Sequence, residues 1–124
     1  MTEAELECIA EGWIRYQIAE EGSAEQAANW DFVSKSFDIR AGDPKILWKL
    51  ILAIHSRDQS EEVQTILSAG PLEELLGSHG PAFIEVVEQQ AKDDPAFARL
   101  LSGLYRFTMS DDVWGRVTAI SNRL

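Results

Sequence analysis

Apolar residues recur along the chain at intervals of three and four, which is the period of an amphipathic α-helix. In the N-terminal stretch, Leu6, Ile9, Trp13 and Tyr16 form one stripe of a predicted helix that runs to about Glu20. Similar stripes follow as far as about residue 120. No stretch of several residues alternates clearly between apolar and polar except 37–41, which we expect to be a loop or a short extended segment.

Residues suited to capping precede most of the predicted helices. A serine or threonine followed three residues later by Glu or Gln is a capping box, and Asp before Pro combines a good N-cap with a proline at the first helical position. The predicted starts are Thr2, Ser23, Asp43-Pro44, Ser60, Asp94-Pro95 and Ser110. Gly70-Pro71 and Gly80-Pro81 are predicted to interrupt the helices, and they leave a short helix between them over 72–78.

These features predict an all-α fold, with a single domain over residues 1–124 and about seven or eight helices packed as antiparallel hairpins. Asp43-Pro44 matches Asp94-Pro95 at an offset of 51, and Ser60 matches Ser110 at an offset of 50. Such recurrence is typical of stacked helical hairpins of the HEAT kind. The alternative is that good capping signals are few and recur by chance.

The tryptophans fall on or beside the apolar stripes. Trp13, Trp30 and Trp114 lie on stripes, and Trp30 shares its stripe with Val33 and Phe37, so we expect these three tryptophans in the core. Aromatic side chains also anchor protein interfaces, and exposure distinguishes the two roles.

The chain is strongly acidic, with 21 Asp and Glu against 11 Lys and Arg and a formal net charge of −10. This balance disfavours binding to nucleic-acid phosphates and to anionic membranes. The excess lies in two blocks, residues 1–31 and 61–94, each with a net charge of −7, and the remaining segments carry +2 each. An acidic surface can steer a basic partner, whereas the simpler interpretation is that it keeps the protein soluble. The candidate partner-binding residues are Glu61, Glu62, Glu73, Glu74, Glu85 and Glu88.

The sequence contains no catalytic constellation that we can identify, and we expect neither enzymatic activity nor a cofactor. His55 and His79 lie near predicted helix ends, where a histidine is favoured by the helix dipole. A metal site formed by His79 with Glu85 or Glu88 is a weaker alternative, since such spacing is not specific. The N-terminus lacks the basic start and the apolar stretch of a secretory signal, so we expect a cytoplasmic protein.

One segment resembles a family of small helical bacterial proteins catalogued as a domain of unknown function. The resemblance rests on the run Ala69-Gly70-Pro71-Leu72-Glu73-Glu74-Leu75-Leu76, and on later features that include Asp94-Pro95 and Val113-Trp114-Gly115-Arg116-Val117. It extends over about residues 43–120. It implies a helical domain of bacterial origin and supplies no catalytic residues.

Small size, two acidic blocks and the expected helical hairpins together predict a non-enzymatic protein-binding module. Its most specific form is an immunity-type protein that neutralises a basic bacterial toxin through an acidic surface. An adaptor or regulator of another host protein is the alternative. The oligomeric state is left open.

Overall fold

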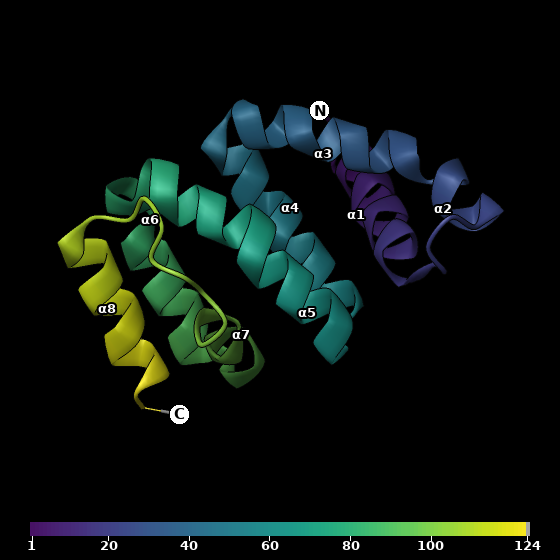
Figure 1. Ribbon diagram of the computed structural model, residues 1–124. Coiled ribbons are helices and arrows are strands. Elements are labelled where there is room, and N and C mark those ends of the chain that lie inside the picture. The colour runs from purple at the N-terminus through teal and green to yellow at the C-terminus, as the bar shows by residue number, and fades with distance from the viewer. Residues whose placement is uncertain (124) are drawn as a thin grey trace. The chain divides into compact units, whose positions relative to one another are not determined.

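The computed structural model describes residues 1–123, and it is all-helical, as the sequence predicts (Figure 1). No strand occurs within that range. The elements are α1 (Glu3–Ile18), α2 (Ala24–Ala28), α3 (Trp30–Ala41), α4 (Pro44–Arg57), α5 (Glu61–Leu67), the π-helical turn η1 (Ser68–Leu72), α6 (Glu73–Asp93), α7 (Pro95–Leu101) and α8 (Asp111–Ser121).

The predicted caps form. Thr2 Oγ1 accepts a hydrogen bond from the Glu5 N–H at 3.1 Å, and Ser23 Oγ accepts one from the Gln26 N–H at the same distance. These bonds satisfy backbone donors that have no partner inside the first turn of a helix. The other four caps accept through Asp43 Oδ1, Ser60 Oγ, Asp94 Oδ1 and Ser110 Oγ.

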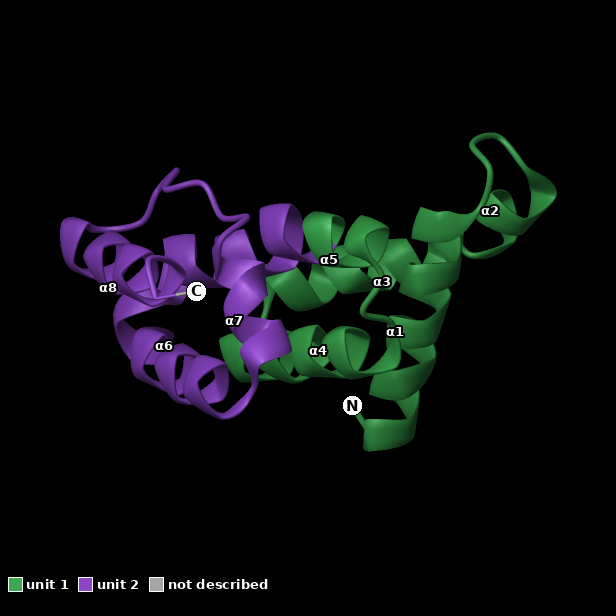
Figure 2. Cartoon of the chain, turned by 90° about the horizontal axis from the view of Figure 1, so that it is seen from below, with its two compact units in different colours: residues 1–66 green, residues 67–124 purple. Residues whose placement is uncertain are grey.

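The chain divides into two compact units, Met1–Ile66 and Leu67–Leu124, shown in different colours in Figure 2. In the first unit α1 packs against α3 and α4, and α3 packs against α4. Its core includes Ile9, Trp13, Val33, Leu50 and Ile54. The short helix α2 touches α1 and α3 but contains no buried residue.

In the second unit α6 packs against η1, α7 and α8, and α7 packs against α8. Its core is formed by apolar side chains from each of these helices, among them Leu75, Ile84, Val87, Phe97 and Val113.

Two expectations about the segment 30–41 are wrong. The residues 37–41 continue α3 as a helix and form neither a loop nor an extended segment. Trp30 and Phe37 are each 49% exposed, whereas Val33, Ser36 and Ile39 form the buried face of α3. Ser36 can be buried because its hydroxyl donates to the Val33 carbonyl at 2.6 Å, so no polar group is left without a partner there. Trp13 is buried as expected, and Trp114 is half-buried.

The two Gly-Pro pairs have different outcomes. Gly70-Pro71 does not stop the helix as predicted, because η1 joins α5 to α6 through a wider π-helical turn. Proline lacks an N–H and crowds the carbonyl of the preceding turn, and a widened turn is one way to accommodate it. Gly80-Pro81 does interrupt the helical geometry, since His79 adopts φ −132° and ψ 23° and kinks α6.

The capping pattern recurs between the two units, but the lengths of the elements do not. The helix after Asp43 has 14 residues and the helix after Asp94 has 7. The connections that follow them also differ, since they span 58–60 and 102–110. Only the capping residues at the helix N-termini therefore recur in the two units.

Candidate partner-binding surfaces

The six predicted partner-binding acids belong to both units. Glu61 and Glu62 are exposed in the first turn of α5, in the first unit. Glu73 and Glu74 are half-buried in the first turn of α6, in the second unit. Glu61 and Glu62 lie at a helix N-terminus, where the positive end of the helix dipole favours carboxylates, whereas Glu73 and Glu74 directly follow the helical turn η1.

Glu85 and Glu88 lie further along α6 and line a groove in the second unit. The groove has a volume of about 520 Å³. Apolar side chains of Ala91, Pro95, Ala98 and Ile120 line it together with Glu85, Glu88, Gln89, Lys92 and Arg123. Because both signs of charge occur around it, this groove is not a purely acidic surface.

Glu88 is also engaged within the unit. Arg116 Nε donates to Glu88 Oε2 at 3.0 Å, and an Arg116 η nitrogen donates to Glu88 Oε1. These hydrogen bonds lower the pKa of the Glu88 carboxyl below its ordinary value, against the smaller opposing effect of burial. The same bonds raise the pKa of Arg116. Glu88 therefore stabilises the packing of α8 on α6, whereas Glu85 is exposed.

The two histidines occupy different settings. His55 is buried, 3% exposed, and its Nδ1 lies 2.8 Å from Gln64 Oε1. The same Gln64 amide donates to the Asp58 carbonyl at 2.8 Å, so it links the end of α4 to α5. His55 is thus buried and hydrogen-bonded to a side chain of α5, near the end of α4.

His79 lies at the kink of α6 and is half-buried. Among residues 1–123, no group of three or more His, Cys, Asp and Glu side chains is placed to hold a metal ion. The alternative metal site at His79 with Glu85 and Glu88 is therefore not assembled. No helix in the same part of the chain is both long enough and apolar enough to cross a membrane.

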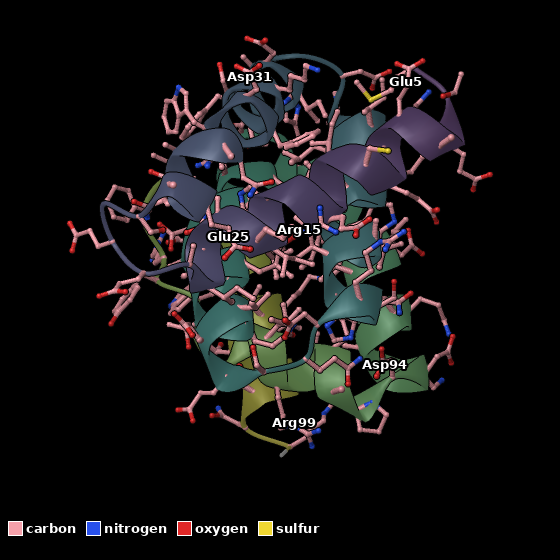
Figure 3. All side chains as sticks on the ribbon, turned by 90° about the vertical axis from the view of Figure 1, so that its right-hand side faces the viewer. Glu5, Arg15, Glu25, Asp31, Asp94 and Arg99 are labelled. Atoms are coloured by element: carbon pink, nitrogen blue, oxygen red, sulfur yellow. The ribbon has the colours of Figure 1, made fainter. Side chains whose placement is uncertain are left out.

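Ion pairs satisfy several of the arginines. Arg57 Nη2 lies 3.2 Å from Glu7 Oε2, and Arg57 Nη1 lies 3.9 Å from Glu11 Oε2. Arg15 pairs with Glu11 at 2.5 Å. Figure 3 looks onto α1, with Glu5 near its N-terminal end and Arg15 further along the helix. Arg15 and Arg57 thus balance the charges of Glu7 and Glu11. The negative charge that remains on the first unit comes from its other carboxylates.

Exposed aromatic side chains are the surface feature that the sequence interpretation missed. Trp30 and Phe37 lie on the outside of the first unit. In the second unit, Tyr105 is 71% exposed and Phe107 is 81% exposed, in the connection between α7 and α8. Phe107 has a φ of +46°, in the left-handed region that non-glycine residues rarely adopt. Adjacent acids and aromatics at 30–31 and 37–38 were the available signal for the first of these surfaces.

The chain belongs to a family of unknown function (DUF6869), which it matches over residues 17–124. The match begins upstream of residue 43, where the resemblance was expected to start, and it takes in α2 and α3. No curated protein and no solved structure matches the chain.

Proposed function

We propose that this family member is a non-enzymatic protein-binding module whose partner presents a basic surface. In its most specific form it is an immunity-type protein that neutralises a bacterial toxin. The proposal is carried by the placement of the acids, since none of the 21 Asp and Glu residues is buried. An excess of acids at the surface attracts a basic protein and raises its rate of association.

The charge is distributed unequally between the two units. Residues 1–66 contain 13 acids and 6 bases, for a net charge of −7, and residues 67–124 contain 8 acids and 5 bases, for −3. The first unit therefore supplies most of the electrostatic attraction. Exposed aromatic residues on both units add the kind of side chain that dominates binding energy at protein interfaces.

A pull-down with the immobilised full chain tests this proposal. A bacterial lysate is applied at about 0.01 M ionic strength, where the Debye length is about 30 Å, and eluted at about 1 M, where it is about 3 Å. The expected result is a basic protein that is retained at low salt and released at high salt. Recovery of only acidic proteins, or of none, contradicts the proposal.

Two variants with the same net charge test whether the predicted acids contact the partner or only contribute to the total charge. The double substitution Glu61→Gln/Glu62→Gln removes two candidate acids, and Ser78→Lys/Ala119→Lys adds two positive charges at exposed positions elsewhere. If Glu61 and Glu62 contact the partner, the first variant weakens retention more than the second. Equal weakening would show that only the total charge matters.

The toxin-neutralising form has its own test. Expression of the retained protein alone is expected to stop bacterial growth, and co-expression of this chain is expected to restore it. A retained protein that is harmless when expressed alone instead favours the second candidate, an adaptor or regulator that uses the same acidic excess.

A further inference from the structure

The outer face of α3 carries an aromatic row beside an acidic row. Trp30 and Phe37 are seven residues apart, which is nearly two helical turns, so they share one face of α3. Asp31 and Asp38 repeat this spacing one residue later, and all four side chains are exposed. Figure 3 labels Asp31 at the outside of the first unit.

Trp30 is held against a second aromatic residue. Its ring lies 5.6 Å from the ring of Tyr16 in α1, measured between centroids, with an angle of 52° between the planes. This tilted contact restricts the indole while about half of its surface stays open to solvent. Restricting an anchor before binding lowers the entropy lost on association. Tyr16, Trp30, Asp31, Phe37 and Asp38 are together called the aromatic–acidic face below.

A cation already lies on one ring of this face. The Arg40 guanidinium carbon lies 4.9 Å from the centroid of the Phe37 ring, within the range of a cation–π contact. Tryptophan attracts a cation more strongly than phenylalanine does, because its ring has a more negative face. Trp30, with Asp31 next to it, is therefore the stronger cation acceptor of the two aromatic residues.

The charges around this face indicate the charge of its partner. Residues 16–31, which include α2, contain Glu20, Glu21, Glu25 and Asp31 and no lysine or arginine. All four of these acids are exposed. On α3 itself, Lys35 is exposed between Asp31 and Asp38, and Arg40 lies over the Phe37 ring. Residues 16–41 therefore hold five acids against two bases and are acidic on balance, which is complementary to a positively charged partner and disfavours an acidic one.

We propose that the aromatic–acidic face docks an arginine-bearing or lysine-bearing segment of a partner protein. One cation of that segment stacks on Trp30, and the carboxylates of Asp31 and Asp38 bind its neighbours. This inference rests on the proposed function, and it assigns the binding of the basic partner to the first unit.

Binding of a defined peptide to the full chain tests the assignment. The probe is a short fluorescein-labelled peptide of arginine, leucine and serine, and its comparison peptide has citrulline in place of arginine. Fluorescence anisotropy at low ionic strength gives the dissociation constants. We expect the arginine peptide to bind more tightly, because citrulline has nearly the same shape and no charge.

Variants at Trp30 are compared with a matched variant in the second unit. Trp30→Leu keeps an apolar side chain but removes the ring, and it is expected to weaken arginine-peptide binding by about two- to fivefold, in line with an exposed cation–π contact. Trp30→Phe should recover part of the loss. Phe107→Leu removes a still more exposed aromatic residue, in the second unit, and should leave binding unchanged.

Asp31→Asn/Asp38→Asn provides a second route to the same result. Both residues are exposed, so this variant should fold normally and weaken binding in a salt-dependent way. Equal effects of Trp30→Leu and Phe107→Leu, or no effect of either, overturn the assignment. A dimer in analytical ultracentrifugation that Trp30→Leu dissociates also overturns it, because the face would then bind a second copy.

The proposed function can survive a failure of this assignment. If the pull-down retains a basic protein and Trp30→Leu retains it equally well, the docking surface lies elsewhere and the proposed function stands. If neither the lysate protein nor the arginine peptide binds, both proposals are wrong.

Discussion

Arg116 in α8 donates two hydrogen bonds to the carboxylate of Glu88 in α6, and its Nε lies 3.0 Å from Glu88 Oε2. The two residues are 28 positions apart in the sequence. Both side chains are about one-third exposed, so water screens the pair only in part. The side-on geometry fixes the orientation of α8 on α6 beside the groove and removes one acid from the surface available to a partner.

Glu88→Gln should destabilise the protein at pH 7 by about 0.5–1 kcal/mol, as expected for a partly exposed ion pair. The folded state lowers the pKa of Glu88, so the pair contributes stability above the pKa of the unfolded chain. That contribution is lost as the pH falls through the lowered pKa of the folded state. Urea unfolding at a series of pH values should therefore show the difference between wild type and variant shrinking in acid.

Glu85→Gln provides the control for this prediction, because Glu85 is exposed on the same helix. It should change the free energy of unfolding much less than Glu88→Gln does. A difference between Glu88→Gln and wild type that stays constant down to acid pH would contradict an electrostatic origin.

Two helical glycines should respond in opposite ways to alanine. A Cβ on Gly12 in α1 would collide with the Phe32 ring and lie 2.7 Å from Phe32 Cβ, so Gly12→Ala should cost about 1–3 kcal/mol. A Cβ on Gly115 in α8 meets no atom within 4 Å. Gly115→Ala should therefore stabilise the protein by about 0.5–1 kcal/mol through helix propensity.

Thermal unfolding of the two glycine variants measures these effects with the same chemical change. A stabilising Gly12→Ala would mean that α1 and α3 can separate slightly without cost. The comparison thus reports how tightly Phe32 packs against α1.

Helix starts could be predicted from the sequence because their chemistry is local. Asp43 and Asp94 each accept a hydrogen bond from the backbone N–H two residues later, so each cap bond joins near neighbours in the sequence. The same is true of Ser110, whose hydroxyl accepts from the Val113 N–H. The all-α fold follows from these starts and from the helical period of the apolar residues.

The buried face of α3 could not be predicted from residue type alone. Hydrophobicity favours the stripe Trp30, Val33 and Phe37, but the packing of α1 and α4 covers Val33, Ser36 and Ile39. Burial depends on which neighbours are present, and a serine bonded to its own helix is tolerated. The exposure of Trp30 and Phe37 follows from this packing, so the repeated aromatic–acid pairs at 30–31 and 37–38 indicate a surface only once the structure is known.

We expect the Gln64 side chain to contribute to the free energy of unfolding, because it forms hydrogen bonds at both ends of its amide group. Its Oε1 accepts from His55 Nδ1 at one end, and its amide nitrogen donates to the Asp58 carbonyl at the other. Gln64→Ala removes both bonds next to a buried imidazole and should cost about 1–3 kcal/mol in urea unfolding. Gln59, whose amide lies 3.5 Å from His55 Nε2, is the control, and Gln59→Ala should cost less than about 0.5 kcal/mol.

The contact between Gly80 and Val113 predicts a coupled pair of substitutions. A Cβ on Gly80, next to the kink at His79, would lie 2.9 Å from Val113 Cγ2 and 3.1 Å from Cγ1. Gly80→Ala should therefore destabilise the second unit by about 1–3 kcal/mol through overpacking. Val113 is fully buried, so Val113→Ala should cost about 2 kcal/mol by leaving a cavity.

The double variant Gly80→Ala/Val113→Ala places the new methyl group in the space that the valine leaves. Its destabilisation should be smaller than the sum of the two single effects by about 0.5–3 kcal/mol, measured as a double-mutant cycle in urea. Gly115→Ala/Val113→Ala is the matched control and should be nearly additive, because a Cβ on Gly115 has no neighbour within 4 Å. If the costs in the Gly80 cycle are additive, Val113 of α8 does not pack closely against Gly80 of α6.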